Sequence, residues 1–253
     1  MWLKLRQIAL VARQLAPAEA ALSEVLGVAV CYRDPGVAHF GLENALFPIG
    51  NQLLEVVAPT REGTAAGRYL ERRGGDGGYM VITQCDDHAP RRARVDALGV
   101  RLAHEFTTKG FVNMQMHPKD TGGTFFEIDQ QLGANANADD GPWEPRGRTG
   151  KRRVDWSACA ASPLPRFNVT TRRGLRSGGP RLRRSRSRTP RNSRYRLPTP
   201  ISALCLAPMV ARGLGGIDVI TADKAAIFAA AKTRGVKRKD NQLHLCGMRV
   251  NLL

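Results

Sequence analysis

One pattern occurs twice in the first 131 residues: a strand, a helix and then three strands, with the second copy starting about 70 residues after the first. Strands are recognised by alternating apolar residues, and helices by apolar residues three and four positions apart. In the first copy, Gly27 ends the helix and Gly50-Asn51 forms the turn between the last two strands. A repeat of this kind predicts two similar βαβββ modules that fold side by side.

The expected elements follow from this periodicity. In the first module they are a strand at 3–12, a helix at 16–27 and strands at 28–34, 39–50 and 51–59. A short helix at 64–74 leads to the second module, with a strand at 79–84, a helix at 87–99 and strands at 100–106, 111–117 and 124–129. A third copy starts near 215, with a strand, a helix stopped by Gly235 and strands around 241–246 and 248–252.

These elements predict an α+β fold with three regions. Residues 1–132 form the two paired modules, and residues 213–253 form a partial third module. Residues 133–212 begin with a linker and continue as a segment rich in Arg, Ser and Pro, a composition typical of disorder.

The net charge of +17 is confined to that middle segment. Residues 146–196 contain sixteen Arg, one Lys and a single acid, Asp155, which gives +16 and leaves +1 for all other residues. A protein whose whole surface binds nucleic acid has its basic residues spread over the fold. The charge therefore describes one segment and not the modules.

Three interpretations of the basic segment stay open. It is an arm that binds RNA or DNA phosphates, an inert linker, or the product of a shifted reading frame. We favour the shifted frame for 146–212, because the third module resumes abruptly after it and GC-rich DNA read out of frame yields Arg, Pro, Ser, Gly and Ala. On that interpretation a nucleic-acid partner is not expected, and the third module lacks partner strands, which leaves an apolar edge exposed.

The remaining composition indicates a cytoplasmic protein. Five Cys are scattered without paired spacing, which argues against a disulfide framework and against a zinc knuckle. No apolar run is long enough to span a membrane, and the first residues do not resemble a signal peptide.

Three stretches carry a resemblance to a known family. The opening "LRQIALVARQL", the strand "LLEVVAP" and above all "HPKDTGGTFFEID" at 117–129 resemble the vicinal oxygen chelate superfamily, also called the glyoxalase/bleomycin resistance/dioxygenase superfamily. The last of these is similar to the end of the second module in methylmalonyl-CoA epimerase and its relatives. The resemblance covers roughly residues 3–131 and, in part, 213–253. It implies that two modules pair into a cupped mixed sheet around a small-molecule site, often with two chains in a dimer.

The resemblance also implies a divalent metal in the cup, held by one residue from the first and one from the last strand of each module. By position these residues are Gln7, Glu55, Tyr79 and Glu127. Tyr79 departs from the family, which has His at that place, so the implied site has a gap. Oxygen donors without His favour Mg²⁺ or Mn²⁺ over Zn²⁺ or Fe²⁺.

The chemistry of such a site predicts an isomerase or lyase that acts next to a carbonyl. A metal polarises the carbonyl, and Glu55 or Glu127 moves the proton on the neighbouring carbon. His39 and His117 are further candidates for substrate contact. One alternative is a protein of the same fold that binds or sequesters a small molecule without metal, and a second is nucleic-acid binding through the Arg-rich segment.

Overall fold

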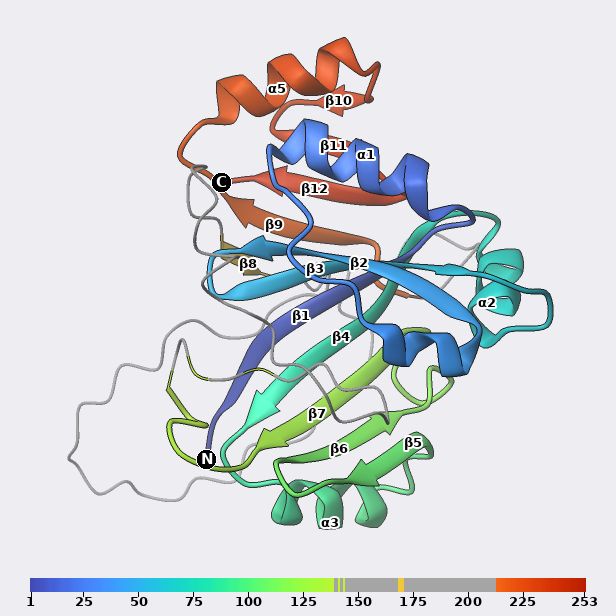
Figure 1. The fold of residues 1–253 in the computed structure, drawn as a ribbon, viewed down its shortest axis with the longest axis vertical. Helices are drawn as coiled ribbons and strands as arrows, with labels where there is room; N and C mark the ends of the chain where they lie inside the picture. Colours follow the sequence, from blue (N-terminus) through green and yellow to red (C-terminus); the bar gives the residue numbers. More distant parts are fainter. Residues whose placement is uncertain (139–140, 142, 144–167, 171–212) are drawn as a thin grey trace, which may run out of the picture.

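The computed structural model describes residues 1–138, 141, 143, 168–170 and 213–253. Within these residues, seven strands form one mixed sheet in the order β2-β3-β1-β4-β7-β6-β5 (Figure 1). A second sheet has the order β10-β11-β12-β9-β8. The α+β fold of paired modules with a small C-terminal module is therefore confirmed.

The first module contains β1 (Leu3–Val11), α1 (Leu15–Leu26), the 3-10 helix η1 (Pro35–Phe40), β2 (Leu42–Ile49) and β3 (Gln52–Pro59). The helix α2 (Ala65–Arg73) connects it to the second module, which contains β4 (Gly77–Cys85), α3 (Ala89–Ala97), β5 (Leu102–Thr107), β6 (Phe111–Met116) and β7 (Phe125–Gln131).

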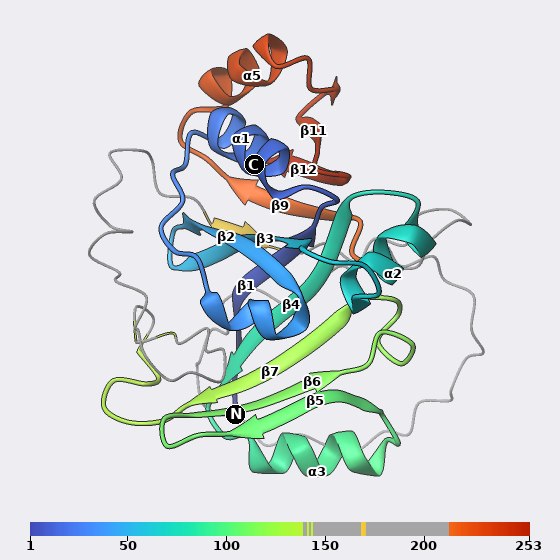
Figure 2. The ribbon, with the colours of Figure 1, turned by 45° about the vertical axis from the view of Figure 1, so that its right-hand side comes forward.

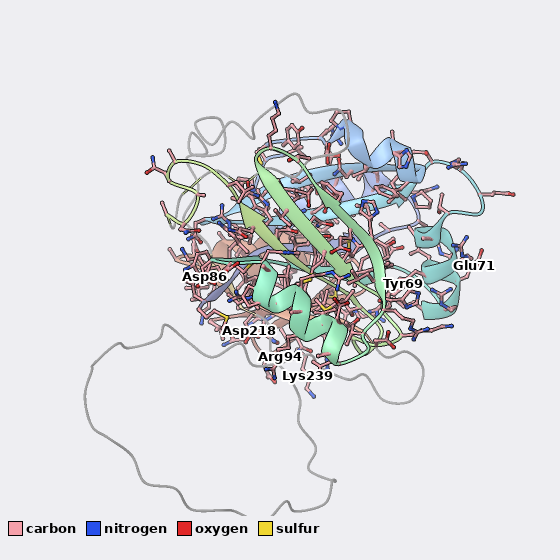
Figure 3. All side chains as sticks on the ribbon, turned by 90° about the horizontal axis from the view of Figure 1, so that it is seen from below. Tyr69, Glu71, Asp86, Arg94, Asp218 and Lys239 are labelled. Carbon is pink, nitrogen blue, oxygen red and sulfur yellow. The ribbon has the colours of Figure 1, made fainter. Side chains whose placement is uncertain are left out.

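Both modules have the same topology. The first and last strands are parallel, β1 beside β3 and β4 beside β7, while the other neighbouring strands are antiparallel. The modules join where β1 runs antiparallel to β4 in the middle of the sheet. Glycines at positive φ end the helices as predicted, with Gly27 at φ 66° after α1 and Gly74 at φ 80° after α2. Tyr69 of α2 points toward the sheet, while Glu71 lies on the outer side of that helix (Figure 3).

The strand predicted at 28–34 is wrong, as is the place of His39 on the next strand. Only an isolated bridge between Tyr32 and Leu46 forms there. Asp34 then accepts a hydrogen bond from the backbone N–H of Gly36 and starts η1, with Pro35 at its first position. Since proline and this cap favour a helical turn, the chain leaves the sheet edge and His39 lies in η1.

The third module packs its sheet against the outside of the first. Its elements are β9 (Gly216–Ile220), α5 (Lys224–Thr233), β10 (Arg238–Lys239), β11 (Gln242–Leu245) and β12 (Met248–Leu252). One apolar core joins α1 and β1–β3 to the buried residues of this module, and α1 lies beside α5 (Figures 1 and 2). The apolar face of the third module is thus covered.

The first strand of the third module also has a partner. The three residues of β8 (Asn168–Thr170) pair antiparallel with β9, in the position that β4 has beside β1. These three residues come from the segment expected to lack regular structure. The other residues of 144–212 lie outside the described part of the chain. The frame-shift hypothesis for 146–212 concerns these residues and stays a prediction from sequence.

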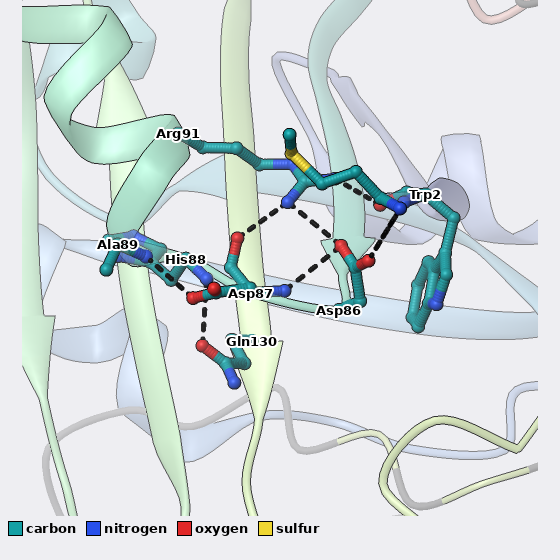
Figure 4. A network of polar contacts seen from close by, with 8 residues as sticks. Trp2, Asp86, Asp87, His88, Ala89, Arg91 and Gln130 are labelled. Carbon is teal, nitrogen blue, oxygen red and sulfur yellow. Dashed lines mark hydrogen bonds and ion pairs between the residues drawn. The ribbon is translucent and has the colours of Figure 1, made fainter.

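The start of the chain is fixed to the second module by polar contacts (Figure 4). Asp86 Oδ2 accepts a hydrogen bond from the Trp2 backbone N–H at 3.1 Å, and Arg91 forms an ion pair with Asp86 at 2.9 Å. Arg91 also donates to the Asp87 carbonyl at 2.6 Å. These contacts lie where the beginning of β1 meets the end of β4, at the pair Leu3 and Cys85. Among the described residues, no helix is both long and apolar enough to cross a membrane.

Candidate functional site

The curved sheet encloses a cavity of about 550 Å³ between the two modules. Its lining comes mainly from β1, η1, α2, the strands β2–β7 and Trp143. All the sequence-predicted site residues lie on this lining: Gln7, His39, Glu55, Tyr79, His117 and Glu127. The topology thus gathers residues that are up to 120 positions apart in the chain. What each of them does there depends on its contacts.

Two β-bulges decide which side chains of the central strands reach the cup. Leu5 and Gln7 pair with Thr83 and Ile82, so Arg6 is an extra residue on β1. Ala9 and Leu10 pair with Met80 and Gly78, so Tyr79 is an extra residue on β4. A bulge turns two successive side chains toward one side of a strand. This explains why Tyr79 and Met80 both line the cavity, although strict alternation would send them to opposite faces.

Glu55 is held by a short chain of amides. Its Oε2 accepts from Gln7 Nε2 at 2.7 Å and its Oε1 accepts from Asn44 Nδ2 at 2.6 Å. Gln7 Oε1 in turn accepts from the Trp143 indole N–H at 3.2 Å, and Asn44 Oδ1 accepts from the Asp34 backbone N–H at 2.8 Å. Each amide is oriented at both ends, so the carboxyl of Glu55 has one fixed position.

Burial raises the pKa of Glu55 to about 7, because removing a carboxylate from water disfavours its charged form. The hydrogen bonds from Asn44 and Gln7 act in the opposite direction and are outweighed. The charges of Asp34 and Glu127 raise the pKa further. A carboxyl with this pKa exchanges its proton readily near neutral pH.

The second module contributes a pair of carboxyls. Glu127 Oε2 accepts from Gln115 Nε2 at 2.9 Å, and Asp129 Oδ1 accepts from Asn113 Nδ2 at 2.7 Å. Glu127 and Asp129 lie two positions apart on β7 and so share one face of it. Burial raises the pKa of both, and for Asp129 the charge of Glu127 and a hydrogen bond between the two add to this increase. The pair therefore retains a proton that isolated carboxyls would lose.

Tyr79 is a wall of the cavity. Its ring makes edge-on contacts with Tyr69 at 5.2 Å and with Phe125 at 5.1 Å between centroids. Burial raises the pKa of the Tyr79 phenol, so its hydroxyl stays protonated and is a poor ligand for a divalent ion.

The donors do not fit the four-ligand metal site that the resemblance implies. Tyr79 contributes no anionic oxygen, and the amide of Gln7 is engaged with Glu55 and Trp143. In the described part of the chain, no three His, Cys, Asp or Glu side chains form a group suited to a metal ion. The interactions within the cup are hydrogen bonds between amides and carboxyls.

An aromatic rim crosses the mouth of the cavity from one module to the other. Phe40 of η1 contacts His104 of β5 at 5.8 Å between ring centroids, and His104 contacts Phe106 at 5.2 Å. His39 belongs to this rim through its contact with Phe40 at 5.2 Å. His117 lies beyond the end of β6, where its Nδ1 accepts from the Lys119 backbone N–H at 3.2 Å, as expected of a residue that shapes a turn.

Trp143 is a cavity residue that the sequence analysis placed in a linker. Its side chain is 2% exposed and packs with Leu46, Leu53 and Ile82, while Arg6 lies over its ring at 5.0 Å. Only the aromatic character of Trp143, isolated in a polar stretch, hinted at burial. Asn44, Gln115, Asn113 and Asp129 were missed as well, since alternation along a strand does not distinguish the cup side from the outer side of a two-sided sheet.

Comparisons with known proteins give structural matches only. No family model and no curated protein matches this sequence. A hypothetical protein from Bacillus halodurans matches at 17% identity and a TM-score of 0.46, over 53% of this chain and 97% of that one.

Two methylmalonyl-CoA epimerases also match in structure. The one from Streptomyces coelicolor, in complex with 2-nitronate-propionyl-CoA, has 20% identity and a TM-score of 0.45 over 51% of this chain and 98% of that one. The one from Mycobacterium tuberculosis has 22% identity and a TM-score of 0.45, over 53% of this chain and 92% of that one. At these identities and TM-scores the matches carry no argument about activity, which rests on the residues of the cavity.

Proposed function

We propose that this protein is an isomerase that moves a proton on a carbon next to a carbonyl group of a small, mainly apolar molecule. The observation that carries the proposal is the placement of Glu55 and of the Glu127–Asp129 pair, from different modules, on the lining of one cavity. Two acid–base groups that border one cavity are what a reaction needs in which a proton leaves a carbon and another returns.

In the proposed reaction the carboxylate of Glu55 takes the proton from the carbon. The electron pair of that C–H bond moves into the carbonyl group and forms an enolate. The Glu127–Asp129 pair then supplies its retained proton to the same carbon, and the carbonyl is restored. Proton transfer to Glu55 balances proton release from the pair, so the net result is an isomerisation without an external oxidant or reductant.

The surroundings of Glu55 suit a base. Gln7 and Asn44 fix its two oxygens at 2.7 and 2.6 Å, so little motion is needed to present the carboxylate to a substrate. A raised pKa makes it a stronger base than an exposed carboxylate.

A metal-assisted form of this reaction, with Mg²⁺ or Mn²⁺ on Gln7, Glu55 and Glu127, is the one predicted from the sequence. The amide network around Glu55 and the neutral Tyr79 favour proton transfer by the protein's own carboxyls instead. Titration of the full chain with Mn²⁺ distinguishes the two forms. An ion that binds in the cup and is lost in Glu55→Gln would favour the metal-assisted one.

The second candidate is a metal-free protein that binds or sequesters a small molecule. It is favoured by the full set of hydrogen bonds on Glu55, which is also the arrangement of a structural carboxyl. Nucleic-acid binding by residues 146–196 stays a prediction from sequence, as does a homodimer.

Exchange of C–H hydrogen with D₂O tests the first candidate against the second. The full chain is incubated with 1-phenylpropan-2-one, an apolar ketone with acidic C–H groups, and exchange is followed by NMR. We expect catalysed exchange that falls by about 100-fold in Glu55→Gln, the usual contribution of a general base. Glu43→Gln, an exposed glutamate on β2, is the matched control and should behave as wild type. Thermal stabilisation by the ketone without catalysed exchange would favour the binding protein.

A further inference from the structure

The cavity lining is rich in hydrogen-bond acceptors and acids, and the basic side chains among its described residues are three His. Four acids lie on its lining: Asp34, Glu55, Glu127 and Asp129. Among the described lining residues there is no Lys and no Arg. A carboxylate or phosphate group on a ligand would find no Lys or Arg to pair with here, and every acid that is ionised would repel it.

One buried acceptor on the lining lacks a donor, and it lies beside the carboxyl pair. Asn113 Oδ1 is buried without a hydrogen-bond partner and its residue is 2% exposed, while Asp129, 1% exposed, has at Oδ2 no donor other than the proton that it shares with Glu127. The Asn113 amide is oriented by its Nδ2, which donates to Asp129 Oδ1 at 2.7 Å. A buried acceptor without a donor costs free energy, and a ligand that brings N–H groups to this place recovers that cost.

The rim above this acidic floor is aromatic. Phe40, 49% exposed at the mouth, begins a series of ring contacts that continues through His104 and Phe106 to Phe111 of β6. Phe125 and Tyr79 extend the aromatic lining from β7 and β4. Aromatic faces attract both an apolar ring and an organic cation.

From these features we infer that the cavity takes a small aromatic molecule that carries a protonated amine. The ammonium group donates to Asn113 Oδ1 and to an ionised oxygen of the Glu127–Asp129 pair, which can keep its shared proton, and the aromatic body lies against the rim. This inference deepens the proposed function, on which it rests in taking the same cavity as the site. An amine in the substrate also supplies a positive charge beside the enolate, which the lining residues themselves do not provide.

A matched set of three ligands tests the inference. Binding of 2-phenylethylamine, 2-phenylethanol and 3-phenylpropanoate to the full chain is measured by titration calorimetry at one pH near 8. The three share a phenyl group and a short chain, and they differ in carrying a positive, a neutral or a negative group. We expect the amine to bind about tenfold or more tightly than the alcohol, because a charge-assisted hydrogen bond to a buried carboxyl is at least that strong, and the carboxylate to bind weakest.

Two variants locate the preference. Glu127→Gln and Asp129→Asn each remove one acid and keep its shape, and each should reduce the ratio of amine to alcohol affinity about tenfold by loss of one charged contact. Glu43→Gln on the exposed side of β2 should leave the ratio unchanged. Thermal unfolding of each variant shows that the fold is retained, and either variant alone suffices if the other does not fold.

Several results would overturn the inference. One is that 3-phenylpropanoate binds as tightly as 2-phenylethylamine or more tightly, and another is that none of the three ligands binds. A third is that the preference for the amine over the alcohol persists in each variant that folds. Displacement of the bound amine by Mg²⁺ or Mn²⁺ at lower concentration would also overturn it, in favour of a metal ion at the same acceptors. None of these results depends on turnover, so a failure here is distinct from a failure of the hydrogen-exchange test.

Discussion

The two modules of the main sheet share one topology but hold their glutamates differently. In the first module, Glu55 is bonded to two amides, Gln7 from β1 and Asn44 from β2. In the second, Glu127 is bonded to two amides of β6, Gln115 and Asn113, and has a second acid, Asp129, beside it. Equivalent positions on the last strand therefore give a single fixed carboxyl in the first module and a pair of carboxyls that share a proton in the second.

The difference begins at the first strands. β1 presents Gln7 to the cup, whereas the bulge on β4 presents Tyr79, which packs with Tyr69 and Phe125 instead of bonding to Glu127. Without an amide from its first strand, the second module takes its donor from β6. A duplicated backbone thus fixes where a side chain can lie, and the side chains of the neighbouring strands decide its protonation.

The largest expected effect concerns the pH dependence of stability in Glu55→Gln. The folded pKa of Glu55 is about 7, above the ordinary value of 4.5, so the folded state binds more protons than the unfolded state between these values. Its contribution to stability therefore falls as pH rises from 4.5 to 7 and is constant above. For a pKa raised from 4.5 to about 7, this loss of stability is about 3 kcal/mol. Glu55→Gln has no titrating group at this position, so its free energy of unfolding should lack this part of the pH dependence.

Urea unfolding of wild type and Glu55→Gln at pH 4.5, 6 and 8 measures this difference. The exposed Glu43→Gln is the control and should follow the wild-type curve. A difference between wild type and Glu55→Gln that does not change over this pH range would mean that Glu55 is charged in the folded protein, as in a solvated carboxylate.

Trp143→Phe tests how the first module fixes its glutamate. The substitution removes the indole N–H that Gln7 Oε1 accepts at 3.2 Å and leaves a gap beside Leu46 and Leu53. We expect a loss of about 1–2 kcal/mol in the free energy of unfolding, from one buried hydrogen bond and a reduced side-chain volume. Trp2→Phe, a partly buried residue away from the cavity, is the matched control. A loss no greater than that of the control would mean that Trp143 does not insert into the cup.

The smallest effect is expected for Tyr79→Phe. In the described part of the chain the contacts of Tyr79 are through its ring, with Tyr69 and Phe125, and phenylalanine preserves them. The free energy of unfolding should change by no more than about 0.5 kcal/mol. Amine binding should also be unchanged. A tenfold loss of binding would instead place the Tyr79 hydroxyl in contact with the ligand and make the two modules more alike than we describe.

Much of this arrangement was predictable from local sequence patterns. Alternating apolar residues located β1, β3, β4 and β7, and glycines located the ends of the helices, because these signals depend on neighbours in the chain. The exception is instructive: residues 28–34 alternate like a strand, but Asp34 and Pro35 start η1 and divert the chain. Local turn chemistry there outweighs β-propensity.

The residue pattern alone shows that a βαβββ module repeats and that Glu55 and Glu127 lie on the last strands of their modules, since periodicity is a local property of the chain. What surrounds these acids follows only from how the strands pair and pack. The bulges at Arg6 and Tyr79 depend on the pairing of β1 with β4, and Trp143 reaches Gln7 across 136 positions of sequence. Such contacts follow from long-range register and from burial, and no pattern within one strand encodes them.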